Sequence, residues 1–438
     1  MKGMPFGIGN LTNLRRLSDF VLGKGDGHHI QEMKNLLNLK GKLRISGLEN
    51  VVNAQDAWEA KLIYKSGLGT LELKWSREFD NNRNKEVEGE VLNLLEPHRE
   101  LEKLRIWNYG GTKFPIWMNS SLKNLSSLVL EGCKNCVSLP SLGKLPLLKN
   151  LFIVGMDELN KVGIEFYGEN QSNAFASLQS LSFWDMPRWK EWDLVDEQVV
   201  KFPSLVELSI HNCPQLLGTL PNRLHSLKKL EIYDCAQMVV SLSDLPKLSE
   251  LQIDECAELV LRDDANFRSI KKVCLSNVVK FSTPTERLVS TSTTLERCEI
   301  YDCEGLTYLS LKKLGLLGSV CKLEIFRCPQ LVLLEPDEVE EAEEELFQVG
   351  NLCNIESLTI WESGLNMESL RIRKHFLSFL TEMEIRNCPN MVCFAKNNLP
   401  PLLKKLRIES CENLRCLVDA GENISISNKQ TEVLQCPE

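Results

Sequence analysis

The sequence lacks the short motifs that carry common enzymatic chemistry. Its 438 residues contain no G-x-x-x-x-G-K-[ST] phosphate loop, no G-x-S-x-G nucleophile turn and no H-E-x-x-H zinc helix. The glycine-rich stretch Gly23-Lys-Gly-Asp-Gly27 has the wrong spacing for phosphate binding, and we interpret it as a flexible turn. The lone pair Cys133-x-x-Cys136 has no second pair at the spacing of a zinc site. We therefore expect neither enzymatic activity nor a bound cofactor.

An excess of positive charge is missing too, as are long apolar runs. Lys and Arg number 51 against 60 Asp and Glu, and the net charge of −9 argues against non-specific binding of nucleic acid. The first residues hold no apolar run long enough for a signal peptide, and no uninterrupted apolar stretch could span a bilayer. The expectation is a protein of the cytoplasm or nucleus that is neither secreted nor anchored by a membrane span.

One short pattern recurs along the chain. Between Leu227 and Met238 the apolar residues fall as L-x-x-L-x-I-x-x-C-x-x-M, and Leu230-Glu-Ile232 alternates with the period of a half-buried strand. Most copies follow one another at steps of 21 to 30 residues, and this spacing and frame indicate leucine-rich repeats. Fifteen copies are recognised by their central apolar residue: Ile45, Leu73, Ile106, Leu130, Ile153, Phe183, Ile210, Ile232, Ile253, Leu275, Ile300, Ile325, Ile360, Ile385 and Ile408.

The repeats predict an α/β leucine-rich repeat solenoid of horseshoe form. About fifteen short strands would build a parallel concave sheet, with irregular loops and short helices on the convex side. The predicted repeat domain covers residues 1–420: repeats with helical insertions in 1–200, then Cys-type repeats with an acidic loop at 335–345 in 201–420. Residues 421–438 are predicted to be a polar tail. Helix formers over 53–65 and 86–95 predict helices on the convex side, with Asn53 or Asp56 as a cap of the first.

Cysteine is plentiful, with 16 residues, but it follows the repeat. Free cysteine is among the most frequently buried residue types, so we expect free, buried thiols at the end of the frame. Eight cysteines occupy this position, one in each unit: Cys133, Cys213, Cys235, Cys256, Cys303, Cys328, Cys388 and Cys411.

The residues that flank the central Leu or Ile of each strand are predicted to face the concave side. Rings amid mixed charge are typical anchors of protein-binding surfaces. An alternative is that the rings pack sideways on one another along the sheet. The position just after the central residue holds seven rings: Trp107, Trp184, His211, Tyr233, Tyr301, Phe326 and Trp361. The charged neighbours in the predicted site are Arg105, Glu231, Asp254, Glu299 and Arg407.

A second candidate site is the locally basic N-terminal end, which holds Arg15, Arg16, Lys40, Lys42 and Arg44. These residues are either solvated surface or a docking patch for an acidic neighbour. The chain begins inside a repeat pattern rather than with a polar capping unit, so a preceding segment is expected.

Several stretches go beyond a generic repeat. They include Gly9-Asn-Leu-Thr-Asn-Leu-Arg-Arg-Leu17, Leu71-Glu-Leu-Lys-Trp75, Tyr109-Gly-Gly-Thr-Lys-Phe-Pro-Ile-Trp117 and Leu139-Pro-Ser-Leu-Gly-Lys-Leu-Pro146. Over essentially its whole length the chain resembles the C-terminal leucine-rich repeat region of plant coiled-coil nucleotide-binding disease resistance proteins. The resemblance implies recognition of a pathogen effector or a guarded host protein. It also implies contact between the N-terminal repeats, around Arg15 to Arg44, and a nucleotide-binding switch domain.

The chain has no phosphate loop, no methionine-histidine-aspartate motif and no coiled coil, so ATP binding is not carried over. We predict a monomeric protein-recognition module of plant immunity that lacks the switch, with protein partners and no nucleic-acid partner. Two alternatives stay open: an adaptor that serves as substrate receptor of a ubiquitin ligase, and a truncated remnant without function.

Overall fold

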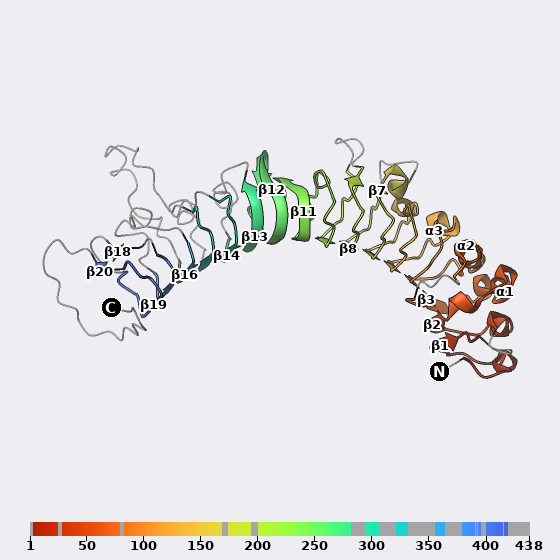
Figure 1. Cartoon of the computed structure of the whole chain (residues 1–438). Helices are drawn as coiled ribbons and strands as arrows, with labels where there is room; N and C mark the ends of the chain where they lie inside the picture. The colour runs from red at the N-terminus through yellow and green to blue at the C-terminus, as the bar shows by residue number, and fades with distance from the viewer. Residues whose placement is uncertain are drawn as a thin grey trace. The chain divides into compact units, whose positions relative to one another are not determined.

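The structure is a computed structural model of the chain. It describes residues 3–24, 29–78, 83–168, 174–193, 200–281, 294–306, 321–331, 355–363, 379–389, 391, 393–395, 400–414 and 416–418. The whole chain is drawn in Figure 1. It divides into two compact units. The first comprises Met1–Leu227 with Asp234–Met238, and the second Lys228–Tyr233 with Val239–Glu438. The predicted acidic loop at 335–345 and the tail at 421–438 lie outside the described residues, and the predicted domain boundaries stay predictions.

The first unit is built on parallel strands in the order β1-β2-β3-β4-β5-β6-β8-β10. A separate parallel pair is formed by β7 (Lys161–Val162) and β9 (Glu191–Trp192). Consecutive strands of the main sheet pair in parallel, so equivalent residues of neighbouring repeats lie side by side. The main strands are β1 (Asp19–Val21), β2 (Gly41–Ser46), β3 (Leu68–Lys74), β4 (Lys103–Trp107), β5 (Ser127–Glu131), β6 (Asn150–Val154), β8 (Ser180–Trp184) and β10 (Glu207–His211).

Alternating burial explains why these segments form strands. In β4, Leu104 and Ile106 are fully buried, while Lys103 and Arg105 are exposed on the other face. Leu104 pairs with Leu71 of β3, so each apolar column continues from repeat to repeat. Burying two such side chains contributes roughly 3–6 kcal/mol per repeat. No single strand could gain this alone, because its apolar face needs the neighbouring repeat.

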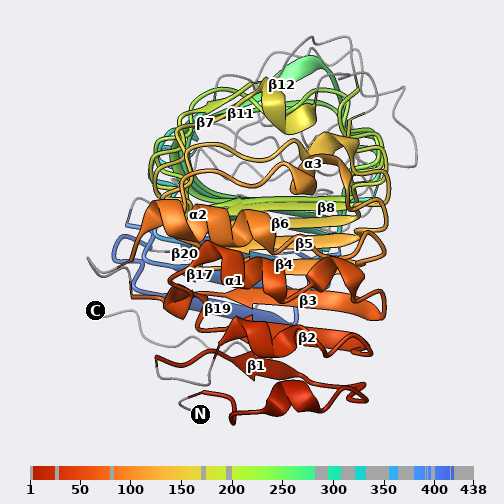
Figure 2. The same cartoon turned by 90° about the vertical axis from the view of Figure 1, so that its right-hand side faces the viewer.

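Helices lie on the outer side of the first unit, away from the strands (Figures 1 and 2). They are α1 (Ala54–Glu59), α2 (Lys85–Leu94) and α3 (Trp117–Ser120). Asn53 caps α1 by accepting a hydrogen bond from Gln55 N at 3.2 Å, and Asn84 caps α2 through Glu86 N and Val87 N. The two predicted helices are thus confirmed, α1 being shorter than its predicted stretch. Short 3-10 turns are η1 (Ile8–Asn10), η2 (Ile30–Met33), η3 (Leu48–Asn50), η4 (Leu62–Tyr64), η5 (Leu142–Lys144) and η6 (Ile164–Tyr167).

The second unit continues the same architecture with strands in the order β11-β12-β13-β14-β15-β16-β17-β19. A separate parallel pair is formed by β18 (Cys393–Ala395) and β20 (Cys416–Val418). The main strands are β11 (Lys229–Asp244), part of which belongs to the first unit, β12 (Glu250–Asn266), β13 (Lys272–Phe281), β14 (Arg297–Tyr301), β15 (Lys322–Phe326), β16 (Ser357–Trp361), β17 (Glu382–Arg386) and β19 (Lys405–Glu409).

The predicted fold is confirmed: every one of the fifteen predicted central residues lies in a strand of a main sheet. Two details differ from the prediction. Strand β1 around Phe20 is an additional repeat strand. Strands β11, β12 and β13 are longer than predicted. In each of them the chain bends at a residue with positive φ, such as Asp234 at 52°, and stays extended after the bend. Buried Val240 and Leu242 continue the alternation there.

The cysteines of the repeat are buried, as predicted, and the structure shows why a thiol suits this position. The residue before the cysteine turns the chain with a positive φ, as at Asp302 (52°) and Arg327 (47°). The thiol then folds back under the bend and donates to a strand carbonyl. Cys303 Sγ lies 3.2 Å from Tyr301 O, and Cys328 Sγ lies 3.3 Å from Phe326 O. A small side chain with a weak donor fits this closed space.

Candidate protein-binding face

The solvent side of each sheet consists of the first, third and fifth residues of the five-residue strands. In β15 the pattern is clear: Leu323 and Ile325 are buried, whereas Lys322, Glu324 and Phe326 are partly exposed. The parallel register places the fifth residues of neighbouring strands side by side, as Tyr301, Phe326 and Trp361 are. The predicted ring positions therefore do form columns on one face of each sheet.

In the first unit, Trp107 at the end of β4 is surrounded by cations. The guanidinium of Arg44 lies 5.4 Å from the centroid of its ring, and the ammonium of Lys74 lies 5.6 Å from it. The indole nitrogen donates to Glu131 Oε2 on β5 at 2.8 Å. These cation–π contacts and the hydrogen bond hold the ring in place while leaving it half-buried.

A buried carboxylate lies at the centre of the same surface. Glu72 lies on the concave face of β3, between Thr70 and Lys74, and is 1% exposed. Its oxygens lie 2.8 Å from Arg44 Nε, 3.0 Å from Lys42 Nζ and 3.9 Å from Arg105 Nε. Three cations thus converge on one carboxylate, which leaves positive charge in excess at this point. The predicted site residue Arg105 lies in this group, beside Trp107.

A second group of rings lies on β6, β8 and β10. Trp184 stacks on His211 with centroids 4.7 Å apart and planes at 8°, and Phe152 meets Trp184 edge-on at 4.8 Å. The prediction included Trp184 and His211 but missed Phe152, which occupies the third rather than the fifth position of its strand. Phe152 follows Leu151 in the same alternating pattern, so the signal for its exposure was present in the sequence.

The second unit carries another run of three rings, which we call the aromatic ridge and define as Tyr301, Phe326 and Trp361. Tyr301 stacks on Phe326 at 4.9 Å, Phe326 meets Trp361 at 5.6 Å, and the guanidinium of Arg386 lies 5.5 Å from the Trp361 ring. The predicted ring Tyr233 is not part of this ridge; its hydroxyl donates to Gln252 Oε1 on β12. Sideways packing of the rings is therefore real, yet each ring of the ridge stays partly exposed.

Charges beside the ridge are largely compensated by pairs within one strand. Arg297 Nε lies 2.8 Å from Glu299 on β14, and Lys322 Nζ lies 2.7 Å from Glu324 on β15. Burial, together with the negative charges of Glu299 and Glu324, raises the pKa of Tyr301 well above its usual value, so this hydroxyl stays protonated.

The remaining charged residues of the predicted face are also paired. Glu231 accepts from Lys229 at 2.9 Å, and Asp254 accepts from the amide of Asn277 at 2.9 Å. Arg407 lies 3.0 Å from Glu409. The pairing could not be read from the repeat frame, because it depends on side-chain conformations.

The structure separates the predicted basic N-terminal group into two parts. Lys42 and Arg44 lie on β2 and reach Glu72 on the concave face. Arg15, Arg16 and Lys40 are exposed outside the strands, and among the described residues they form no ion pair. A backbone hydrogen bond of 2.8 Å from Lys40 N to Arg15 O keeps two of them in neighbouring turns.

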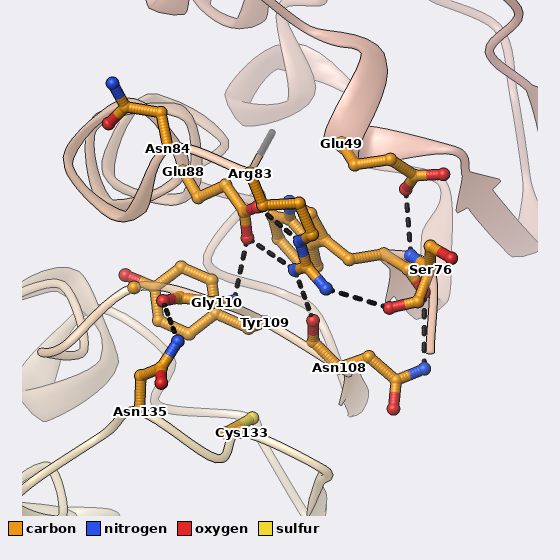
Figure 3. Close-up of polar contacts among 12 residues, drawn as sticks. Glu49, Ser76, Arg83, Asn84, Glu88, Asn108, Tyr109, Gly110, Cys133 and Asn135 are labelled. Carbon is orange, nitrogen blue, oxygen red and sulfur yellow. Dashed lines mark hydrogen bonds and ion pairs between the residues drawn. The ribbon is translucent and has the colours of Figure 1, made fainter. Parts of the chain in front are cut away.

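A buried polar cluster, shown in Figure 3, binds the backbone directly after strand β4. It thereby helps to hold Trp107, the last residue of that strand, in position. Arg83 and Glu88 bind each other through two contacts of 2.7 Å, and Arg83 also donates to the carbonyl of Asn108, directly after Trp107. The carboxylate of Glu88 accepts from Gly110 N at 2.7 Å. This cluster cannot be predicted from the sequence. The ion pair joins the loop before α2 to α2 itself, and its contacts with Asn108 and Gly110 exist only in the folded chain.

The packing around this cluster explains why two glycines, Gly110 and Gly111, follow Tyr109. The Tyr109 ring is fully buried, and burial raises the pKa of its hydroxyl, which donates to Lys113 O at 2.8 Å. A Cβ atom on Gly110 would lie 2.7 Å from Glu88 Oε2, and one on Gly111 would lie 2.1 Å from the Tyr109 oxygen. Both glycines are thus required by close approach of side chains to the backbone.

The described residues contain no group of three or more His, Cys, Asp or Glu side chains that could hold a metal ion. The Cys133–Cys136 pair is buried, and burial raises the pKa of Cys133 to about 12. Among the helices in the described ranges, none has the length and apolar character needed to cross a membrane.

Stacked parallel strands with two inward apolar residues each, closed by a buried thiol, define a leucine-rich repeat protein. Residues 30–156 match the family described as R13L1/DRL21 LRRs. The chain is 37% identical over 333 residues to disease resistance RPP13-like protein 1 of Arabidopsis thaliana, covering 72% of this chain and 30% of that protein. It is 36% identical over 263 residues to disease resistance protein RGA2 of Solanum bulbocastanum, covering 57% and 26%. These matches support a leucine-rich repeat region of a plant nucleotide-binding disease resistance protein, as the sequence predicts.

The matched segment spans less than a third of the length of either relative. Among solved structures, TLR13 in its complex with ssRNA13 superposes with a TM-score of 0.50 at 15% identity, covering 91% of this chain and 58% of that chain. This likeness concerns the fold alone.

Proposed function

We propose that the concave face recognises a protein in plant defence, either a pathogen effector or a host protein that the plant guards. Support comes from the relatives, which are named as disease resistance proteins, and from the chemistry of the face. The single observation that carries the proposal is the aromatic ridge: three contacting rings on consecutive strands, partly exposed and flanked by charges that are already paired. Rings held in this way lose little conformational freedom on binding and can bury large apolar areas.

The same proposal assigns recognition rather than catalysis to the chain, in the cytoplasm or nucleus and as a monomer. In a longer protein of this type, recognition would have to be coupled to a nucleotide-binding domain. Arg15, Arg16 and Lys40, exposed and without ion pairs among the described residues, are the residues that we propose for contact with such a domain. Lys42 and Arg44 lie instead on strand β2, on the face that carries Glu72, and are not part of that proposed contact.

The test begins with a pairwise binding screen of the chain against pathogen effectors and host defence proteins. A binder is then measured against the variant Tyr301→Ala/Phe326→Ala/Trp361→Ala. We expect the affinity to fall at least a hundredfold, because the ridge supplies the apolar anchors. The folded state of the variant is checked by circular dichroism. Unchanged affinity in a folded variant would exclude the ridge as the binding site.

A further inference from the structure

We infer that the concave face of β2, β3 and β4 binds an acidic segment of a protein partner. We call this surface the basic patch and define it by Lys42, Arg44, Lys74, Lys103 and Arg105. The inference rests on the proposed function, since it names the chemistry of a protein partner. It concerns the sheet of the first unit, whereas the aromatic ridge lies on the sheet of the second unit, and the two are tested separately.

The basic patch carries a net positive charge that the chain itself does not neutralise. The first, third and fifth concave positions of β2, β3 and β4 hold five cations and one carboxylate, Glu72, which leaves a net charge of +4. The neighbouring strands add one carboxylate on each side, Asp19 on β1 and Glu131 on β5. Asp19 lies 3.3 Å from Arg44, and Glu131 is engaged by the Trp107 indole. The charge stands out in a chain whose net charge is −9.

Burial decides which of these charges a partner meets. Glu72 is covered, with its side chain 2% exposed, so its negative charge is directed inward. The cations around it stay accessible to solvent: the Lys42 and Arg105 side chains are 51% and 48% exposed. Lys74 and Lys103 are exposed and form no ion pair among the described residues. A partner that approaches this face therefore meets ammonium and guanidinium groups, with the one carboxylate of the three strands beneath them.

The size of the basic patch fits a short extended peptide. Strands about 4.8 Å apart and residues about 3.3 Å apart give a surface of roughly 10 by 13 Å, which spans three or four extended residues. Two or three carboxylates on such a segment could reach the Arg and Lys groups, and Arg favours carboxylates by paired hydrogen bonds. We propose a protein segment rather than a nucleic acid as the occupant, because the proposed function of the chain is recognition of a protein; the test below includes a nucleic acid.

The test uses fluorescein-labelled decaglutamate as the probe and the full chain in low salt, with binding followed by fluorescence anisotropy. We expect saturable binding that weakens with added salt. The variant Lys74→Glu/Lys103→Glu should weaken binding at least tenfold. The matched variant Lys149→Glu/Lys190→Glu changes the net charge equally at exposed lysines outside the basic patch and should change affinity less than twofold. Decaglutamine should not bind.

Each other outcome has a defined meaning. Absence of decaglutamate binding, or equal losses in the two charge-reversal variants, overturns the inference. Tighter binding of a ten-nucleotide single-stranded DNA, lost in the same variant, would replace the acidic segment by nucleic acid and also overturn it. Should Lys74→Glu/Lys103→Glu fail to fold, Lys74→Gln/Lys103→Gln takes its place with an expected loss of at least threefold. The ridge variant should retain decaglutamate binding, so failure of the ridge proposal and failure of this one are distinguishable.

Discussion

Arg83 and Glu88 form a buried ion pair that ties helix α2 to the end of strand β4. Both side chains are less than a tenth exposed, and their closest atoms lie 2.7 Å apart. Between them they bind the Asn108 carbonyl and the Gly110 amide, the backbone groups that follow Trp107. A structural ion pair thereby determines where a concave ring lies.

Removing one partner of this pair should be strongly destabilising. Arg83→Ala leaves the Glu88 carboxylate buried without its cation, and we expect a loss of about 3–5 kcal/mol in the free energy of unfolding. Arg99→Ala is the control, because Arg99 is exposed and its contact with Glu100 is 3.5 Å; it should cost less than about 1 kcal/mol. Urea unfolding followed by tryptophan fluorescence compares them. Equal midpoints would show that the ion pair does not stabilise the first unit.

Two glycines near Tyr109, Gly89 and Gly111, should respond differently to alanine. Gly111→Ala places a Cβ against the buried Tyr109 ring, and overpacking of this kind costs about 1–3 kcal/mol. Gly89→Ala in α2 meets only the Tyr109 oxygen at 3.6 Å, an ordinary contact. It should be neutral or stabilise the helix by up to about 1 kcal/mol. Thermal unfolding of both variants checks the order, which the reverse ranking would contradict.

A buried lysine should make stability depend on alkaline pH. Lys65 is fully buried, and its ammonium donates to Met33 O at 2.8 Å and to Leu36 O at 2.9 Å. Burial, aided by the nearby charge of Lys61, lowers the pKa of Lys65 from 10.5 to about 8. Between these two values Lys65 binds more protons in the unfolded chain than in the folded one, so its own contribution to stability should rise as the pH increases from 8 towards 10.5.

The variant Lys65→Met tests this dependence. Wild type and variant are unfolded in urea at several pH values, with the exposed Lys123→Met as control. The slope of the unfolding free energy against pH should be the same in the wild type and the control, and smaller in Lys65→Met by up to one proton equivalent. An unchanged slope in Lys65→Met would contradict the contribution of Lys65.

Cysteine reactivity should follow burial rather than sequence motif. Cys321 is exposed, whereas Cys133 and Cys136 of the C-x-x-C pair are buried, and burial raises the pKa of Cys133 to about 12. Iodoacetamide at pH 8 should therefore modify Cys321 in the native chain and spare Cys133 until the chain unfolds. Peptide mass spectrometry before and after denaturation gives the order. Early labelling of Cys133 would mean that the first unit opens locally.

Much of the fold was readable from the chain because each repeat states its own pattern. The L-x-x-L-x-I frame located every predicted strand, since its period of two decides which residues are buried. Strand β1 was missed because Phe20 lacks that frame. The repeat frame predicts that β11 ends before Cys235, but the strand continues to Asp244. Val240 and Leu242, which are buried, continue the alternation there.

For the protein-binding face, the sequence could predict which residues line up on the solvent side of the sheet, but not which of them contact one another. Alternation placed Trp107 and Trp361 on the solvent side, but it could not show that Tyr301, Phe326 and Trp361 contact one another, nor that Tyr233 donates to Gln252. Those contacts depend on side-chain conformations and on neighbours 20 or more residues away. The same holds for Glu72, whose burial under three cations depends on strands that are adjacent only after folding.

Protein recognition by the aromatic ridge is tested most directly by one comparison. The affinity of an identified protein partner is measured for the wild-type chain and for the ridge variant Tyr301→Ala/Phe326→Ala/Trp361→Ala. The control removes three exposed rings outside the strands, by Phe6→Ala/Trp58→Ala/Tyr64→Ala. The account predicts an affinity loss of at least a hundredfold in the folded ridge variant and less than threefold in the control. Equal affinity of the ridge variant and the wild type, or a loss confined to the control, would contradict recognition by the concave face.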